Sequence, residues 1–90
     1  MAHLTSPVPV HLVPIGGADR LIEKRRTLPP ELTVRALRLL LQRQLGINEP
    51  VYIFVRGFAP SPENSLWDLY QHFKEENELV VRYSRQLVFG

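Results

Sequence analysis

The residues Phe89 and Gly90 follow a run at 78–83 that predicts a final strand, and they close the chain. Glycine has no Cβ, so a glycine tail can enter a narrow channel that excludes other residues. An unhindered glycine carboxylate suits a protein whose own C-terminus is the reactive acyl group. Gly90 alone favours the plainer interpretation, the frayed end of a domain. The rest of the chain has to decide between these interpretations.

Residues that commonly perform catalysis form no recognisable pattern. The histidines His3, His11 and His72 lack the spacing of metal ligands, and no serine lies in a G-x-S-x-G motif. The chain contains no cysteine, which excludes a thiolate nucleophile and a disulfide framework within it. Gly16 and Gly17 predict a hairpin turn, because no helix starts there to bind a phosphate. We therefore expect no enzyme, no metal site and no cofactor.

Two surface features have the composition of binding sites. Phe58 and Pro60 lie in a segment, 58–62, whose two prolines exclude regular structure. There Phe58 either plugs the edge of the core or anchors a partner.

The second feature is a set of basic residues on the second predicted strand and the long helix. Its members are Arg20, Lys24, Arg25, Arg26, Arg35, Arg38 and Arg43. They form either a solvated face or a docking site for an acidic partner or an anionic membrane. We expect no nucleic-acid ligand, because the net charge is only +2 and no stacking aromatics accompany these residues.

A long helix at 32–45 has to position the basic residues. Its apolar stripe consists of Val34, Leu37, Leu41 and Leu45. Thr33 is the expected N-cap and Gly46 the expected residue after the last turn. Arg35 and Arg38 fall on the opposite face. A short helix capped by Ser65 is expected through Phe73.

Strands are predicted at 8–15, 21–28, 51–55 and 78–83. The high charge of the second predicts a strand at a sheet edge. The third is a continuous apolar run, which predicts a central strand covered on both faces. The order of elements predicts an α+β fold of the β-grasp (ubiquitin-like) type, a four-stranded mixed sheet packed on one long helix plus a short helix.

Ninety residues fit a single domain. We expect a flexible N-terminal segment at 1–9, the ubiquitin-like domain at 10–84 and a tail ending in glycine at 85–90. Neither a secretory signal nor an apolar run of the ~20 residues needed to span a bilayer is visible, so we expect a cytoplasmic protein.

From about Val10 to Gly90 the sequence resembles the autophagy-related protein twelve family of ubiquitin-like modifiers. The most specific segment is 58–62, within a similar stretch at 55–63; 14–18, 69–70, Phe73, 78–81, Tyr83 and the final glycine add to it. Phe89 stands where that family commonly has tryptophan, so an aromatic residue is retained. The lipid-conjugated sister family, the eighth autophagy-related protein, carries two helices before the first strand, for which the residues ahead of Val10 leave too little room.

The resemblance implies a conjugation route. An E1-like activating enzyme would adenylate Gly90, and E2-like conjugating enzymes would pass it to a lysine of autophagy-related protein five. The conjugate, with the coiled-coil partner of protein five, would promote lipidation of the lipid-linked modifier at the forming autophagosome (phagophore) membrane. Membrane association would be peripheral, through this complex.

The expected tail and partner contacts are Phe89, Phe58, Pro60, Arg35 and Arg38. Two alternatives stay open: a non-covalent β-grasp partner in the same complex, and a lipid-conjugated autophagy modifier.

Overall fold

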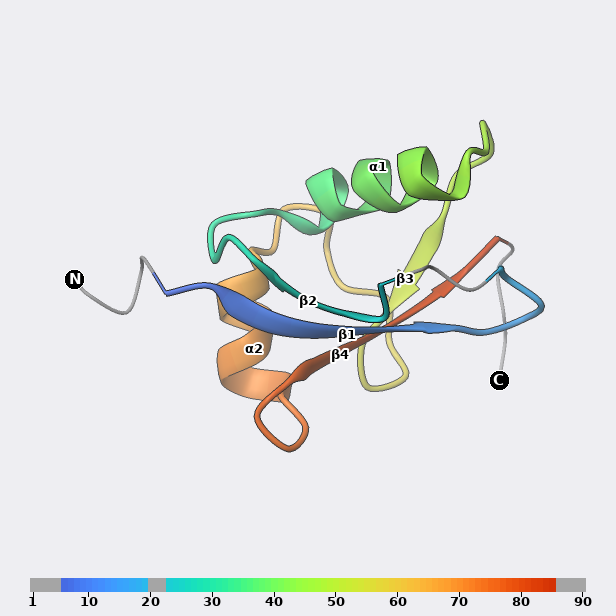
Figure 1. The fold of residues 1–90 in the computed structure, drawn as a ribbon. Coiled ribbons are helices and arrows are strands. Elements are labelled where there is room, and N and C mark those ends of the chain that lie inside the picture. The colour runs from blue at the N-terminus through green and yellow to red at the C-terminus, as the bar shows by residue number, and fades with distance from the viewer. Residues whose placement is uncertain (1–5, 20–22, 86–90) are drawn as a thin grey trace.

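The computed structural model describes residues 6–19 and 23–85, which form one four-stranded sheet and two helices. The elements in chain order are β1 (Val8–Pro14), β2 (Arg25–Leu28), α1 (Val34–Leu45), β3 (Tyr52–Phe54), α2 (Leu66–Phe73) and β4 (Leu79–Ser84). The strand order is β2-β1-β4-β3, and α1 lies across one face of the sheet (Figure 1). The central pair β1–β4 is parallel and both outer pairs are antiparallel. The predicted β-grasp architecture is confirmed.

Both helices begin and end where local signals predict. The Thr33 hydroxyl accepts the Ala36 N–H at 3.2 Å, and the Ser65 hydroxyl accepts the Asp68 N–H at 3.1 Å. Each bond satisfies a backbone donor that the first turn of its helix leaves unpaired. At the end of α1, Gly46 adopts a left-handed φ of 68°, which glycine adopts without steric cost. The expected caps are confirmed.

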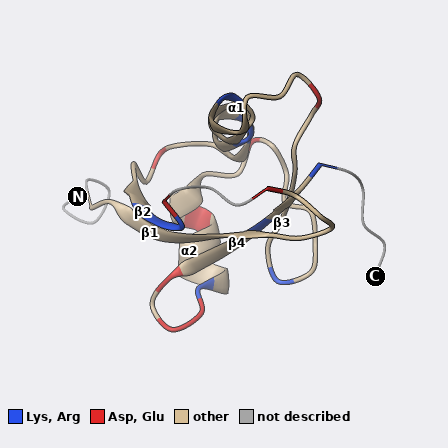
Figure 2. Ribbon diagram, turned by 45° about the vertical axis from the view of Figure 1, so that its right-hand side comes forward, with Lys and Arg blue, Asp and Glu red and all other residues tan. Residues whose placement is uncertain are grey.

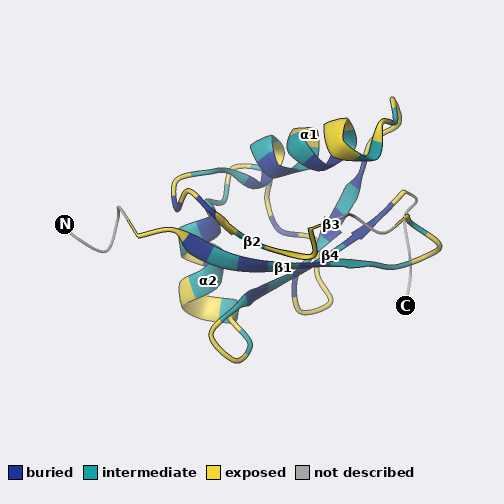
Figure 3. Cartoon of the chain, viewed as in Figure 1, coloured by how far each residue is buried: buried dark blue, intermediate teal, exposed yellow. Residues whose placement is uncertain are grey.

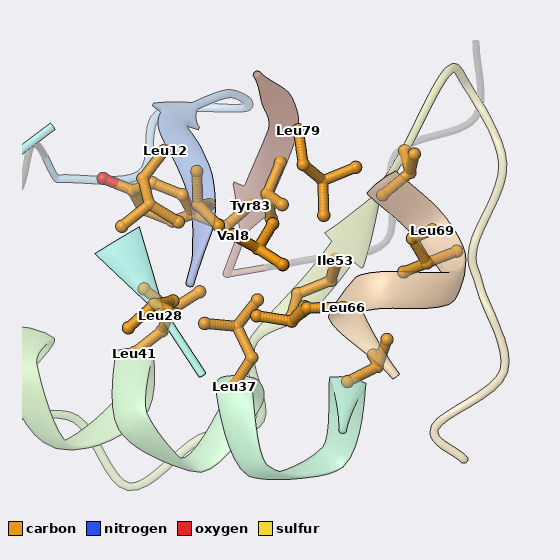
Figure 4. Close-up of a cluster of buried hydrophobic side chains, with 14 of the residues drawn as sticks. Val8, Leu12, Leu28, Leu37, Leu41, Ile53, Leu66, Leu69, Leu79 and Tyr83 are labelled. Atoms are coloured by element: carbon orange, nitrogen blue, oxygen red, sulfur yellow. The ribbon is translucent and has the colours of Figure 1, made fainter. Parts of the chain in front are cut away.

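The core lies between α1 and the sheet, where alternate strand residues point toward the helix. Figure 3 shows the buried residues of α1 on its sheet-facing side, and Figure 4 shows the side chains that meet there. The buried strand residues include Val8, Val10 and Leu12 of β1, Ile53 of β3, and Leu79, Val81 and Tyr83 of β4. This alternation is what a sheet covered on one face requires.

The prediction of a central strand at 51–55 is wrong, because β3 lies at the edge of the sheet and pairs with β4 alone. The run is apolar because other elements cover it. Ile53 faces the core, while Tyr52 and Phe54 are half-buried on the opposite face. A continuous apolar run therefore indicates that both faces of a strand are covered. Whether the strand lies at the centre or the edge of the sheet depends on its pairing with residues far away in the sequence.

The other strand boundaries differ in smaller ways. β1 begins at Val8, as predicted for this strand, and ends one residue early at Pro14; Val8 is fully buried although the domain was expected to begin at residue 10. β2 begins at Arg25 and lies at the other sheet edge, as predicted; the expected strand start at Leu21 and Ile22 falls outside the described residues. Ser84, one residue past the predicted strand 78–83, belongs to β4 and is buried.

Candidate binding site

The loop 58–62 lies in the connection from β3 to α2 and passes the start of α1. Val55 and Phe58 exchange two backbone hydrogen bonds, of 2.8 and 3.1 Å, around a tight turn. Gly57 occupies this turn with a φ of 83°, a conformation that favours glycine. At the far end of the loop, the Arg35 N–H donates to the Pro62 carbonyl at 3.0 Å. The loop is thereby fixed at both ends.

Phe58 packs against Phe73 of α2 and is also accessible. Its ring meets that of Phe73 edge-on, with 5.0 Å between the centroids and 65° between the planes. The residue nevertheless remains 39% exposed. Phe58 thus contributes to packing against α2 and keeps a surface that a partner can contact.

A hollow of about 150 Å³ lies between β3, α1 and the loop 58–62. We call it the β3–α1 hollow; its lining residues are Val34, Arg38, Tyr52, Ile53, Phe54, Ala59, Pro60 and Pro62. All but Arg38 are apolar or aromatic. A concave apolar site with one charged group at its rim is the usual form of a binding pocket.

Arg38 lies between this hollow and a second one. Its Nε donates to the Val51 carbonyl at 3.0 Å. It also lines a shallower hollow of about 340 Å³ formed by Arg35, Arg38, Leu39, Gln42, Asn48 and Pro50. The prediction placed Arg38 on the solvent face of α1. The residue is instead half-buried, because its long side chain extends over the sheet edge.

The predicted positive face is not continuous. In Figure 2 the basic residues are spread over α1, the strands and the loops, with acidic residues among them. Arg25 pairs with Glu78 at 3.0 Å, Arg35 with Glu63 at 2.7 Å and Arg26 with Glu23 at 3.8 Å; Arg20 lies outside the described residues. Exposed pairs of this kind add little stability, but they neutralise the charge that was expected to attract a partner.

Of the predicted contact residues, the structure brings Pro60 and Arg38 into one hollow and Arg35 into the adjoining one. Phe58 lies apart, against Phe73. Phe89 and Gly90 lie outside the described residues. Sequence reasoning missed other lining residues, including Tyr52, Phe54 and Ala59. The period-two alternation of a strand could have placed the two aromatics together on the face opposite Ile53.

The described part of the chain holds no group of three or more metal-ligating side chains. The His72 Nδ1 lies 2.8 Å from the Asp68 carbonyl one turn back in α2. The described helices include none long and apolar enough to span a membrane.

Comparison with known proteins identifies the family. The model of the ubiquitin-like autophagy protein Apg12 family matches residues 7–90. The ubiquitin-like protein ATG12 of Meyerozyma guilliermondii is 31% identical over 85 residues, covering 92% of this chain and 40% of that protein. The Dictyostelium discoideum ubiquitin-like protein atg12 is 30% identical over 88 residues, covering 94% of this chain and 71% of that one.

Solved structures share the fold. The crystal structure of Trypanosoma brucei ATG8 superposes with a TM-score of 0.84 at 18% identity, covering 94% of this chain and 78% of that one. Plasmodium falciparum Atg8, solved in complex with a Plasmodium falciparum Atg3 peptide, gives 0.79 at 19% identity, covering 90% and 77%. Identities this low establish the fold alone. The match of the family model over nearly the whole chain goes further: the chain belongs to the ubiquitin-like autophagy protein Apg12 family.

Proposed function

We propose that this protein is a ubiquitin-like modifier of autophagy whose Gly90 is joined to a lysine of autophagy-related protein five. The observation that carries this proposal is the family match over residues 7–90, which includes Gly90. β4 holds the chain as far as Ser84, which is buried and pairs with Tyr52. Only residues 85–89 separate Gly90 from this anchored strand. Six residue steps from Ser84 to Gly90 span at most about 22 Å when extended, so an enzyme that reaches Gly90 is also close to the sheet.

In the proposed reaction, the Gly90 carboxylate attacks the α-phosphorus of ATP, which forms an acyl adenylate and releases pyrophosphate. A cysteine thiolate of the E1-like enzyme displaces AMP to give a thioester. Exchange with a thiolate of an E2-like enzyme moves the acyl group, and a lysine amine then displaces that thiol to form an isopeptide bond. This chain supplies the acyl group and contact surfaces, and its partners supply the nucleophiles.

The proposed conjugate acts with the coiled-coil partner of autophagy-related protein five. It promotes transfer of the lipid-linked modifier to phosphatidylethanolamine. In this proposal the protein is cytoplasmic and is recruited with this complex to the phagophore membrane. Phe58 and Arg35, which are both exposed, are proposed contacts within the complex.

The test is incubation with the E1-like enzyme and ATP. Wild type should give an adduct that a thiol reductant removes, whereas a variant lacking Gly90 should give none. A matched control carries one alanine added after Gly90, which leaves every native residue in place but displaces the reactive carboxylate. An adduct of equal yield from all three proteins would contradict the covalent route.

The second candidate is a non-covalent β-grasp partner in the same complex, and the β3–α1 hollow favours it because a built contact surface needs no reactive terminus. Under this alternative, deletion of Gly90 leaves the affinity for autophagy-related protein five unchanged. The same set of variants therefore separates the two functions when binding and adduct formation are both measured.

A further inference from the structure

The outer edge of β3 presents one open backbone position, at Ile53. The Ile15 N–H donates to the Tyr83 carbonyl at 2.9 Å, so the backbone of Tyr83 faces β1. Tyr83 is also the residue opposite Ile53 in the β3–β4 ladder. In an antiparallel ladder, opposed residues that do not bond to each other point their N–H and C=O groups outward. The backbone groups of Ile53 therefore point away from β4, toward the free edge.

The outward-facing positions on either side of Ile53 are occupied in part at Val51 and fully at Val55. The Val51 carbonyl accepts the Nε–H of Arg38, and Val55 pairs with Phe58. Ile53 itself lines the β3–α1 hollow, and no hydrogen bond from its outward backbone groups to a described residue is seen. An edge strand with unpaired groups is a template for another chain. Here the template is restricted to one residue, which lies beside an apolar pocket.

The charge at the rim of the hollow favours an acidic ligand. Among the described residues, no carboxylate lies within 4.0 Å of the Arg38 guanidinium, although Arg25, Arg26, Arg35, Arg56, Arg82 and Arg85 each have one. In the described part of the chain, the one hydrogen bond seen for the Arg38 side chain is that from its Nε to the Val51 carbonyl. A guanidinium presents five N–H donors in a fork that matches a carboxylate. Arg38 therefore has donors left for a carboxylate from outside the chain.

We propose that the β3–α1 hollow binds an extended, acidic segment of a partner protein. One residue of the segment pairs with the Ile53 backbone, a neighbouring apolar side chain enters the hollow, and an Asp or Glu carboxylate binds Arg38. This is strand addition to a sheet edge, in which main-chain bonds supply affinity and pockets supply specificity. The volume of about 150 Å³ accommodates one side chain of benzene size. The inference rests on the binding role proposed above and does not require a bond to Gly90.

The test titrates a ¹⁵N-labelled variant lacking Gly90 with capped peptides in which valine alternates with aspartate. Use of this variant separates the inference from the conjugation route, since no adduct can form. We expect shifts of the Ile53 amide and of residues lining the hollow, and slower hydrogen exchange at Ile53. A peptide with lysine in place of aspartate should bind at least about tenfold more weakly, and so should a peptide N-methylated at alternate residues.

Two arginine variants on one helix provide the matched comparison. Arg38→Gln should remove most of the preference for the aspartate peptide over the lysine peptide. Arg43→Gln, at an exposed position that does not line the hollow, should keep it. Arg38→Gln also loses the hydrogen bond to the Val51 carbonyl, so its effect on peptide binding does not come from charge alone. The chemical-shift changes in the protein that keeps Arg38 therefore serve as an independent measure of where the peptide binds.

Several results would overturn the inference. They are shifts confined to β2 or α2, equal affinity for the two charged peptides, and absence of binding at millimolar peptide. Ile53 shifts that depend on protein concentration without peptide would assign the edge to a second copy of this chain, which also contradicts the proposal.

Discussion

Tyr83 joins the end of β4 to the turn that follows β1. Its side chain is fully buried, and its hydroxyl donates to the Asp19 carbonyl at 2.7 Å across 64 positions of sequence. Its backbone carbonyl accepts the Ile15 N–H. One residue therefore holds the β1–β2 connection against the strand that leads to the tail.

Tyr83→Phe should lower the free energy of unfolding by about 1 kcal/mol, the net value of a typical hydrogen bond. The loss stays modest because Asp19 is exposed, so its carbonyl can bond to water instead. For a domain of this size, the midpoint of thermal unfolding should fall by about 4–8 °C. Urea unfolding followed by circular dichroism measures the change. Tyr52→Phe, at a half-buried tyrosine of β3, is the control and should stay within ~0.5 kcal/mol of wild type.

The helix α2 depends on its cap and its packing. It has eight residues, and isolated helices shorter than about 12 residues are marginal in water. Leu66 and Leu69 are buried against the strands, and Ser65 caps the first turn. Phe73, in its last turn, supports the ring of Phe58. The orientation of Phe58 is thus tied to the integrity of α2.

Ser65→Ala should cost about 1 kcal/mol, because the Asp68 N–H loses its acceptor. Ser65→Asp keeps an acceptor of the preferred type at the same position and should retain most of the stability. Chemical denaturation of both variants gives the comparison. Equal destabilisation by alanine and aspartate would show that packing of Ser65, and not its cap, matters.

The sequence predicts those features of these elements that depend on neighbouring residues, and it does not predict those that depend on residues far away in the chain. Thr33, Gly46 and Ser65 act on residues within one turn, so their effects are visible in the sequence. The position of β3 at the sheet edge depends on pairing between Tyr52 and Ser84, which no local pattern contains. The Arg25–Glu78 pair likewise joins residues 53 positions apart.

The same limit applies to the candidate site. Pro60 and Arg38 were predicted singly as partner contacts, and the fold places them in one hollow. Helical periodicity assigns Arg38 to the face opposite Leu37 and Leu41, which describes the direction of its Cα–Cβ bond. The reach of the side chain to the Val51 carbonyl depends on where β3 lies, and the tertiary arrangement alone provides that information.

At the scale of the whole molecule, a single hydrophobic core holds the β3–α1 hollow and Phe58 in place. The buried residues of both helices and of the strands form a single cluster. A domain of this kind is stabilised by about 5–15 kcal/mol in total. The six ion pairs of the described residues are at the surface, where each contributes about 0–1 kcal/mol. Apolar burial under α1 therefore decides whether the protein stays folded.

Two leucines of α1 test this directly, since they differ in burial and are only two positions apart. Leu37 is 0% exposed and Leu39 is 58% exposed. Leu37→Ala should lower the free energy of unfolding by about 2–5 kcal/mol, through lost burial and the cavity it leaves. Leu39→Ala removes the same atoms from the surface and should stay within ~0.5 kcal/mol of wild type. Guanidinium denaturation measures both changes, with the curves fitted to one common dependence of the unfolding free energy on denaturant concentration.

Equal costs at the two positions would contradict the packing of α1 on the sheet. With the expected difference, Leu37→Ala would lose a large fraction of the total stability, and a binding defect in that variant would report unfolding. Leu39 lines the second hollow without supporting the core. A binding defect in Leu39→Ala at unchanged stability would therefore mean that the partner segment extends past Arg38 along α1, and unchanged binding would confine it to the β3–α1 hollow.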